Sequence, residues 1–216
     1  MSISIVGDAA GWKRDLFPEG FVPDILKLVI NAWKKFSKPN RLDLEVKINK
    51  AFTKILRSEK TDLPFKILPE VTVFKENNDN EGRIDIQFSY IGTADEDNYF
   101  AFECKRLRIP YPPPQKLSTN NSDYVGDQGM RCFVTGKYSS RVRHGGMIGY
   151  VMDGKTDSAI ISVTKLINKK RTELKLVSGT SLGISSIMVK HRNVKETKHN
   201  LAFSRNFTIY HIFLSV

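Results

Sequence analysis

The stretches IDIQFSY, residues 84–90, and YFAFECKRL, residues 99–107, decide the fold of this chain. In the first stretch apolar residues alternate with polar or charged ones, which is typical of a half-buried β-strand, and in the second Phe100, Phe102 and Cys104 share one face of a strand. A polar turn at residues 93–97 separates the two stretches. We therefore predict an antiparallel hairpin in which each strand has one apolar and one polar face.

The register of this hairpin brings three charged side chains together. A hairpin centred on residue 94 pairs Asp85 with Glu103, and residues 103 and 105 of one strand point to the same face. Asp85, Glu103 and Lys105 are therefore expected to cluster on neighbouring strands. The opposite face is expected to turn toward the core and to carry Ile84, Ile86, Phe100 and Phe102.

Helical and extended patterns alternate along the rest of the chain. The predicted elements besides the hairpin are helices at residues 24–36, 41–59, 122–138 and 158–176, and strands at residues 65–74, at 147–152 and in the tail from residue 184. Asn40 and Asp43 resemble a capping box at the start of the second helix. On that helix Lys47, Lys50 and Lys54 lie opposite an apolar stripe. The order of elements indicates an α/β or α+β fold.

The clustered charges of the hairpin point to metal chemistry. Two neighbouring carboxylates repel, and Lys105 supplies one positive charge, whereas a divalent cation supplies more. Mg²⁺ and Mn²⁺ favour carboxylate oxygens, so Asp85 and Glu103 are candidate metal ligands. A lysine beside such a metal can orient or deprotonate an attacking water, and these parts together make a phosphodiester hydrolase. The alternative is a solvated sheet edge that carries an ordinary ion pair.

Glu45 is a fourth candidate of this site and a third candidate metal ligand. On a helical wheel it lies within the apolar stripe of the second helix, between Phe52 and Leu56. A glutamate on the buried side of a helix needs a partner, and the carboxylate site would provide one. The alternative is that Glu45 reaches solvent and pairs with Arg41, one turn earlier on the same helix.

These residues resemble the motif of the PD-(D/E)xK nuclease superfamily, which has the restriction-endonuclease-like fold. The resemblance covers roughly residues 41–152, and one departure is that Ile84 stands where the motif has proline. It implies a central mixed sheet flanked by helices, with Asp85 and Glu103 as metal ligands and Lys105 as the motif lysine. Many members also use a helix glutamate, which Glu45 matches. Gln128 resembles a polar position that some members place near the site.

Positive charge is concentrated in the last two-fifths of the chain. The chain carries 34 Lys and Arg against 23 Asp and Glu, a net charge of +11. Residues 1–130 contain 19 of each sign, whereas residues 131–216 contain 15 basic and 4 acidic residues. This one-sided excess favours a nucleic-acid partner over a membrane, and the alternative is a basic surface that only aids solubility. The residues expected to contact phosphates are Arg131, Lys137, Arg141, Arg143, Lys169, Lys170, Arg171, Lys190 and Arg192.

The expected function is therefore a Mg²⁺- or Mn²⁺-dependent endonuclease that cuts double-stranded DNA. The family resemblance implies a role in restriction or anti-phage defence, with a homodimer or a larger defence complex as partners. Two alternatives are a non-catalytic nucleic-acid-binding module of the same fold and a ribonuclease toxin. We expect one domain over residues 1–216, with a catalytic core at about 41–155 and a basic part at 156–216. No run of 18 apolar residues and no signal-peptide pattern is readable, so we expect a cytoplasmic protein without a membrane partner.

Overall fold

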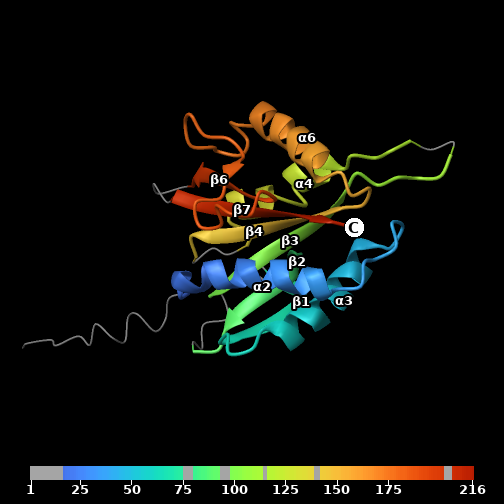
Figure 1. Ribbon diagram of the computed structural model, residues 1–216. Coiled ribbons are helices and arrows are strands. Elements are labelled where there is room, and N and C mark those ends of the chain that lie inside the picture. Colours follow the sequence, from blue (N-terminus) through green and yellow to red (C-terminus); the bar gives the residue numbers. More distant parts are fainter. Residues whose placement is uncertain (1–16, 75–79, 93–97, 114–115, 139–141, 202–205) are drawn as a thin grey trace, which may run out of the picture.

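Helices cover both faces of one mixed β-sheet (Figure 1). The computed structural model describes residues 17–74, 80–92, 98–113, 116–138, 142–201 and 206–216. The elements in chain order are η1 (Glu19–Phe21), α2 (Val22–Lys35), α3 (Glu45–Glu59), β1 (Phe65–Phe74), β2 (Asn80–Tyr90), β3 (Tyr99–Leu107), α4 (Asn121–Val125), α5 (Arg131–Val134), β4 (His144–Val151), α6 (Thr156–Lys169), β5 (Gly183–Ile184), β6 (Val194–Asn200) and β7 (Asn206–Ser215). The predicted mixed sheet with flanking helices is therefore confirmed, whereas the finer family assignment remains a proposal.

The described chain forms a seven-stranded sheet in the order β1-β2-β3-β4-β7-β6-β5. The neighbours β3–β4 and β4–β7 are parallel, and all other neighbours are antiparallel. β4 passes close beside β3 because Gly146 lies opposite Phe102, and a Cβ at Gly146 would collide with the Phe102 ring. The C-terminal strand β7 lies between β4 and β6, so the basic tail contributes strands to the same sheet as the carboxylate hairpin.

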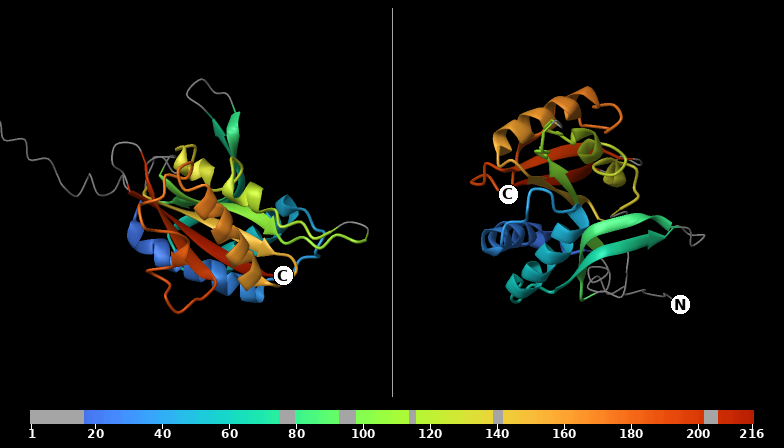
Figure 2. Two further views of the ribbon diagram at one scale, coloured as in Figure 1. Left: turned by 90° about the horizontal axis from the view of Figure 1, so that it is seen from above. Right: turned by 90° about the vertical axis from the view of Figure 1, so that its right-hand side faces the viewer.

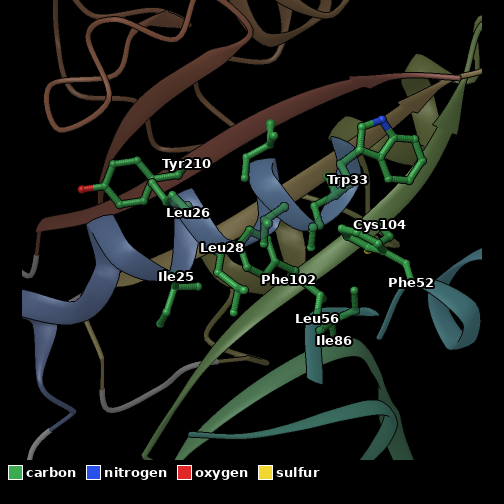
Figure 3. Close-up of a cluster of buried hydrophobic side chains, with 14 of the residues drawn as sticks. Ile25, Leu26, Leu28, Trp33, Phe52, Leu56, Ile86, Phe102, Cys104 and Tyr210 are labelled. Carbon is green, nitrogen blue, oxygen red and sulfur yellow. The ribbon is translucent and has the colours of Figure 1, made fainter. Parts of the chain in front are cut away.

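Two helical layers bury the two faces of the sheet. On one face α2 and α3 pack against β1 to β4 and β7, and Figure 3 shows side chains of both helices meeting Ile86, Phe102 and Cys104 of the sheet. On the other face α4, α5 and α6 pack against β3, β4 and β7. Figure 2 shows the two layers on opposite sides of the strands. The dense apolar pattern of α2 explains its burial, since seven of its residues are buried.

Helix α3 begins four residues later than the sequence predicts. Leu44 is its N-cap residue, with an extended backbone, and no side chain caps the helix. The predicted capping pair forms a separate turn instead, because the Asn40 N–H donates to Asp43 Oδ2 and the Leu42 N–H donates to Asn40 Oδ1. The later start places Glu45 in the first turn of the helix.

Three further predictions are wrong in detail. The helix expected over residues 122–138 is divided into α4 and α5, because Gly126 adopts an extended conformation and a Cβ at Gly129 would collide with the carbonyl of Tyr124. The helix expected over residues 158–176 ends at Lys169. Ile84 packs in the core under α4 to α6, apart from Ile86, because β2 leaves β3 between these positions.

A chain of buried hydrogen bonds joins α4, β6 and β7. Tyr124 Oη lies 3.0 Å from His211 Nδ1, and Thr197 Oγ1 lies 2.9 Å from His211 Nε2 and 2.7 Å from His199 Nε2. His199 Nδ1 ends the chain 2.7 Å from the carbonyl of Leu174. Because that carbonyl only accepts, donation must run from Tyr124 through His211 and Thr197 to His199, with both imidazoles neutral. Burial lowers the pKa of His199 to about 4 and that of His211 well below its usual value.

Replacing Thr197 by valine is expected to lower the free energy of unfolding by about 2–4 kcal/mol at pH 7. The variant leaves one histidine acceptor and one histidine donor buried without partners, and each costs about 1–3 kcal/mol. Urea denaturation measures the loss. Thr164→Val is the control, because its hydroxyl bonds a carbonyl of its own helix. Equal losses of unfolding free energy in the two variants would show that the buried histidine chain stabilises the fold no more than one hydrogen bond within a helix does.

Candidate active site

The site forms where β2 separates from β3. The two strands pair from Ser89↔Tyr99 to Ile86↔Phe102, the register centred on residue 94 that the sequence predicts, although the turn at residues 93–97 lies outside the described residues. Beyond Ile86 toward its N-terminal end, β2 continues to pair with β1. Within the described ranges, the edge of β3 from Cys104 onward therefore has no strand partner on this side.

Two carboxylates take the place of the missing strand. Asp85 Oδ2 accepts a hydrogen bond from the Cys104 N–H at 2.7 Å, and Glu45 Oε2 accepts one from the Arg106 N–H at 2.9 Å. These amides would otherwise be unpaired donors at a buried edge. The local fold thus explains how an aspartate of β2 and a glutamate of α3 are held against the same strand. It also excludes the alternative in which Glu45 turns to solvent and pairs with Arg41.

Lys105 lies among the carboxylates of three elements. Its Nζ is 2.8 Å from Glu103 Oε1, 3.1 Å from Glu45 Oε1 and 3.8 Å from Asp85 Oδ2. The side chains of Asp85, Glu103 and Lys105 are each less than a tenth exposed, and that of Glu45 is 24% exposed. The predicted cluster of four residues is confirmed as a spatial group. The predicted alternative of a solvated sheet edge is wrong, because three of the four side chains are buried.

Burial and mutual repulsion disturb the protonation of the cluster. Burial, opposed by Lys105, raises the pKa of Asp85 to about 6. Burial and the charge of Asp85 raise the pKa of Glu103 well above its usual value. Burial alone would lower the pKa of Lys105, but the charges of Glu103, Asp85 and Glu45 outweigh it and raise that pKa. When all three carboxylates are ionised, they leave an excess of negative charge around one ammonium group, and this excess favours a further cation.

Within the four-residue cluster, one carboxylate oxygen has no hydrogen-bond partner among the described residues. Glu103 Oε2 is buried and unpaired, and Asp85 is near enough for its charge to raise the pKa of Glu103. Two ionised carboxylates have no hydrogen to share, so the contact is repulsive unless a proton or a metal ion lies between them. A buried acceptor without a partner costs about 1–3 kcal/mol, and in native proteins such an atom calls for a ligand or an ordered water.

Sequence reasoning missed the residues that orient Asp85. Asn49 of α3 donates to Asp85 Oδ1 at 3.0 Å and lies 3.4 Å from Glu70 Oε1, while the Tyr150 hydroxyl donates to Asn49 Oδ1 at 3.0 Å. Glu70 has φ +57° within β1 and forms an ion pair with Arg83 at 2.7 Å. Asn49 follows Glu45 by four residues on the buried face of α3, and this spacing was a signal that could have found it.

Gln128 is not among these residues. It lies on an exposed turn between α4 and α5, because the helix expected to carry it is interrupted. Among the residues that the structure describes, no hydrogen bond or ion pair joins Gln128 to Asp85, Glu103 or Lys105. The side chains nearest to Glu103 on this side include Cys132 and Tyr138, whose pKa values the Glu103 charge raises in addition to burial.

The basic residues expected to contact phosphates fall on both faces of the sheet. Lys169 ends α6, and Lys170 and Arg171 follow it in one helical layer, whereas Lys190 and Arg192 line a cavity of about 650 Å³ beside α2 in the other. The remaining positions of the set are Arg131 and Lys137 near α5, Arg143 before β4, and Arg141, which lies outside the described residues. The set is therefore spread over both helical layers.

Several of these side chains also have partners within the chain. The Arg171 guanidinium donates to the carbonyls of Thr180 and Val177 and so ties the loop after α6. Arg131 pairs with Asp127 at 2.8 Å, Lys170 with Glu173 at 3.1 Å and Arg192 with Asp157 at 2.8 Å. Lys169, Lys190 and Arg143 are exposed.

The cluster fits a divalent cation by the chemistry of its donors. As the side chains are placed, no group of three or more His, Cys, Asp and Glu in the described parts has metal-holding geometry, and Lys105 stands between the carboxylates that would provide it. The excess negative charge and the unpaired Glu103 Oε2 are the two observations that favour such an ion. Asp85, Glu103 and Glu45 are the residues that would hold it.

The comparisons with known proteins do not assign this chemistry. No family model, no curated protein and no solved structure matches the chain. None of the helices within the described ranges is long and apolar enough to cross a membrane. The functional argument for this chain therefore rests on the geometry and the charge of the carboxylate–lysine cluster.

Proposed function

We propose that this protein is a Mg²⁺- or Mn²⁺-dependent endonuclease that hydrolyses phosphodiester bonds of double-stranded DNA. The observation that supports it best is a buried lysine shared by three carboxylates at the point where two strands separate. A purely structural ion pair needs one carboxylate for one lysine, because each extra buried charge costs free energy. An acidic excess held in place by backbone and amide donors is instead typical of a site that receives a cation.

Each residue of the cluster has a role in this proposal. Asp85, Glu103 and Glu45 hold the cation, which when bound neutralises charge on the phosphodiester and on the leaving oxygen. Asn49 is a positioning residue, since it donates to Asp85 and is oriented by Tyr150. Lys105 is protonated at neutral pH in this environment, so it would donate hydrogen bonds to the developing negative charge and would not itself take the proton of the attacking water. The resemblance to the PD-(D/E)xK nucleases adds the expectation of a defence or restriction role, in a homodimer or a larger complex.

A cleavage assay on four substrates tests the proposal. Plasmid, duplex oligonucleotide, single-stranded DNA and RNA are incubated with Mg²⁺, with Mn²⁺ or with EDTA. We expect metal-dependent cleavage of the two duplex substrates. Cleavage of RNA alone would favour the ribonuclease alternative, and binding without any cleavage would favour the non-catalytic module.

Replacing Asp85 by asparagine is expected to weaken Mn²⁺ binding at least about tenfold and to reduce cleavage with it. The amide keeps the shape of the side chain but removes one of the charges that would hold the cation. Isothermal titration calorimetry with Mn²⁺ measures the affinity in the absence of DNA. Asp157→Asn is the matched control, because Asp157 lies in α6, in the helical layer opposite α3, and forms an exposed ion pair with Arg192. Unchanged Mn²⁺ affinity in Asp85→Asn would rule out the assigned ligand set.

A further inference from the structure

Helix α3 has two faces of opposite charge. Its inward face contributes Glu45 and Asn49 to the cluster. Its outward face carries exposed basic residues at i, i+3, i+7 and i+10, which together we term the α3 stripe: Lys47, Lys50, Lys54 and Arg57. These spacings follow one side of an α-helix, so the four side chains form a continuous line. One rigid element therefore connects the carboxylate cluster to a basic surface.

The charge balance of the first 130 residues conceals this surface. That part of the chain has equal numbers of basic and acidic residues, but several of the acidic side chains lie within the site and not on the surface. Asp85 and Glu103 are buried, and Glu70 is held by Arg83 and Asn49. The lysines of α3 remain on the outside. A region without net charge thus presents a positive surface beside a negative site.

We infer that the α3 stripe binds the phosphate backbone of duplex DNA and guides it to the carboxylate cluster, an inference that rests on the proposed nuclease function. Glu45, in the first turn of α3, is the most exposed member of the cluster at 24%. Lys47 follows two residues later, with its side chain 72% exposed. The cluster therefore meets solvent at the end of the helix where the stripe begins.

The length and the free charges of the stripe suit a DNA backbone. From Lys47 to Arg57 the helix rises about 15 Å, and a strand of B-DNA carries one phosphate per about 3.4 Å of helix axis. Lys50 and Lys54 have no carboxylate partner among the residues that the structure describes, whereas Lys47 pairs with Asp43. Two free cations in the middle of the stripe are therefore ready for phosphate contacts.

The composition of the stripe favours duplex over single-stranded nucleic acid. Proteins that hold single strands combine positive charge with aromatic side chains on which bases stack. Phe52 is the one aromatic residue of α3 and is buried in the core, so the face of α3 that carries the stripe offers no aromatic surface. Charge without stacking surface is the pattern of sequence-independent backbone binding.

The double variant Lys50→Glu/Lys54→Glu tests this inference. The matched variant is Lys165→Glu/Lys169→Glu, which reverses an equally exposed pair of lysines at i, i+4 on α6. Binding of a fluorescein-labelled 20-base-pair duplex is followed by anisotropy at several salt concentrations with Ca²⁺ in place of Mg²⁺, and cleavage is followed separately with Mg²⁺. We expect the α3 variant to lose at least about tenfold in affinity and about two units of the salt slope, more than the α6 variant loses.

The two readouts separate this inference from the proposed function. Duplex cleavage that is as fast in the α3 variant as in the wild type, with unchanged affinity, would overturn the α3 stripe while the nuclease proposal stands. An equal or larger loss in the α6 variant would also overturn it. Tighter binding of single-stranded DNA or RNA than of duplex would contradict the assignment to duplex. Binding that depends on the stripe without cleavage in any metal would support the surface and contradict the nuclease.

Discussion

Replacing Lys105 by alanine is expected to abolish metal-dependent cleavage and to destabilise the metal-free protein. The sequence alone suggests that this lysine is dispensable for folding, because it faces away from the apolar side of its strand. The structure places it instead as the cation that neutralises Glu103, Glu45 and Asp85. Removing one partner of a buried ion pair costs about 3–5 kcal/mol. We expect a melting temperature lower by roughly 10 °C and a cleavage rate lower by at least about 10³-fold.

The metal dependence of the Lys105→Ala variant is as informative as its loss of activity. A divalent cation replaces part of the missing charge, so Mg²⁺ is expected to raise the melting temperature of the variant more than that of the wild type. Lys105→Met retains most of the side-chain volume and separates the lost charge from the lost packing. Lys116→Ala, on an exposed position after β3, is the surface control. Wild-type stability without metal, or wild-type cleavage with it, would show that Lys105 does not hold the cluster together.

The sequence predicts the centre of the site because local rules determine it. The period of two in β2 and β3 and the polar turn between them define a register that joins Asp85 to Glu103. The position of Glu45 follows from the apolar stripe of α3, although the helix begins later than expected. These predictions hold because each depends on residues that are near in sequence or on one repeating pattern.

The rest of the site depends on contacts that no local pattern contains. Asn49 acts on Asp85 only because Tyr150 of β4 orients its amide, and β4 follows α3 by about a hundred residues. Glu70 reaches Asn49 from a residue with positive φ within β1, a backbone conformation that no local sequence pattern predicts. Gln128 was assigned to a helix that two glycines interrupt.

The basic surface predicted from the sequence rests on net charge alone. A sum over a segment adds buried and exposed charges alike. Residues 1–130 have no net charge, but the two signs are separated in space. Acidic side chains lie in the site, and lysines lie on the outward face of α3. The excess of residues 131–216 is spread over both layers and partly used in ion pairs. Position, more than net charge, decides which lysines are free to meet a phosphate.

Replacing Glu103 by glutamine is expected to remove activity and yet to stabilise the metal-free protein. Glutamine keeps a carbonyl oxygen for Lys105 Nζ, which lies 2.8 Å from Glu103 Oε1. Its amide group offers a donor toward Asp85, where the wild type has two facing acceptors. The substitution thus removes a buried charge and satisfies both neighbours. We expect a melting temperature higher by a few degrees in EDTA at pH 8, together with weaker Mn²⁺ binding and loss of cleavage.

The pH dependence of this stabilisation has a definite sign. The pKa values of Glu103 and Asp85 are raised in the folded protein, so the folded state holds these protons more tightly than the unfolded chain. Their contribution to stability is therefore present at low pH and is lost as the pH rises through the raised pKa values, which for Asp85 means from about 4 to about 6. His199 and His211 act in the opposite direction, because their lowered pKa values make acid destabilising. The difference between variant and wild type cancels the histidines and isolates the carboxylates.

Thermal unfolding of Glu103→Gln and wild type in EDTA at pH 5, 6.5 and 8 measures that difference. The advantage of the variant is expected to be smallest at pH 5 and to grow as the pH rises, because each proton that the wild-type carboxylates release leaves a buried charge that glutamine cannot acquire. Mg²⁺ is expected to remove the advantage by stabilising the wild type alone, because the cation compensates the charge that glutamine lacks. A variant that is less stable than the wild type at pH 8 in EDTA would mean that Glu103 is a structural partner of Lys105. If removal of the Glu103 carboxylate makes the fold more stable and also abolishes cleavage, that charge is kept for function and not for folding.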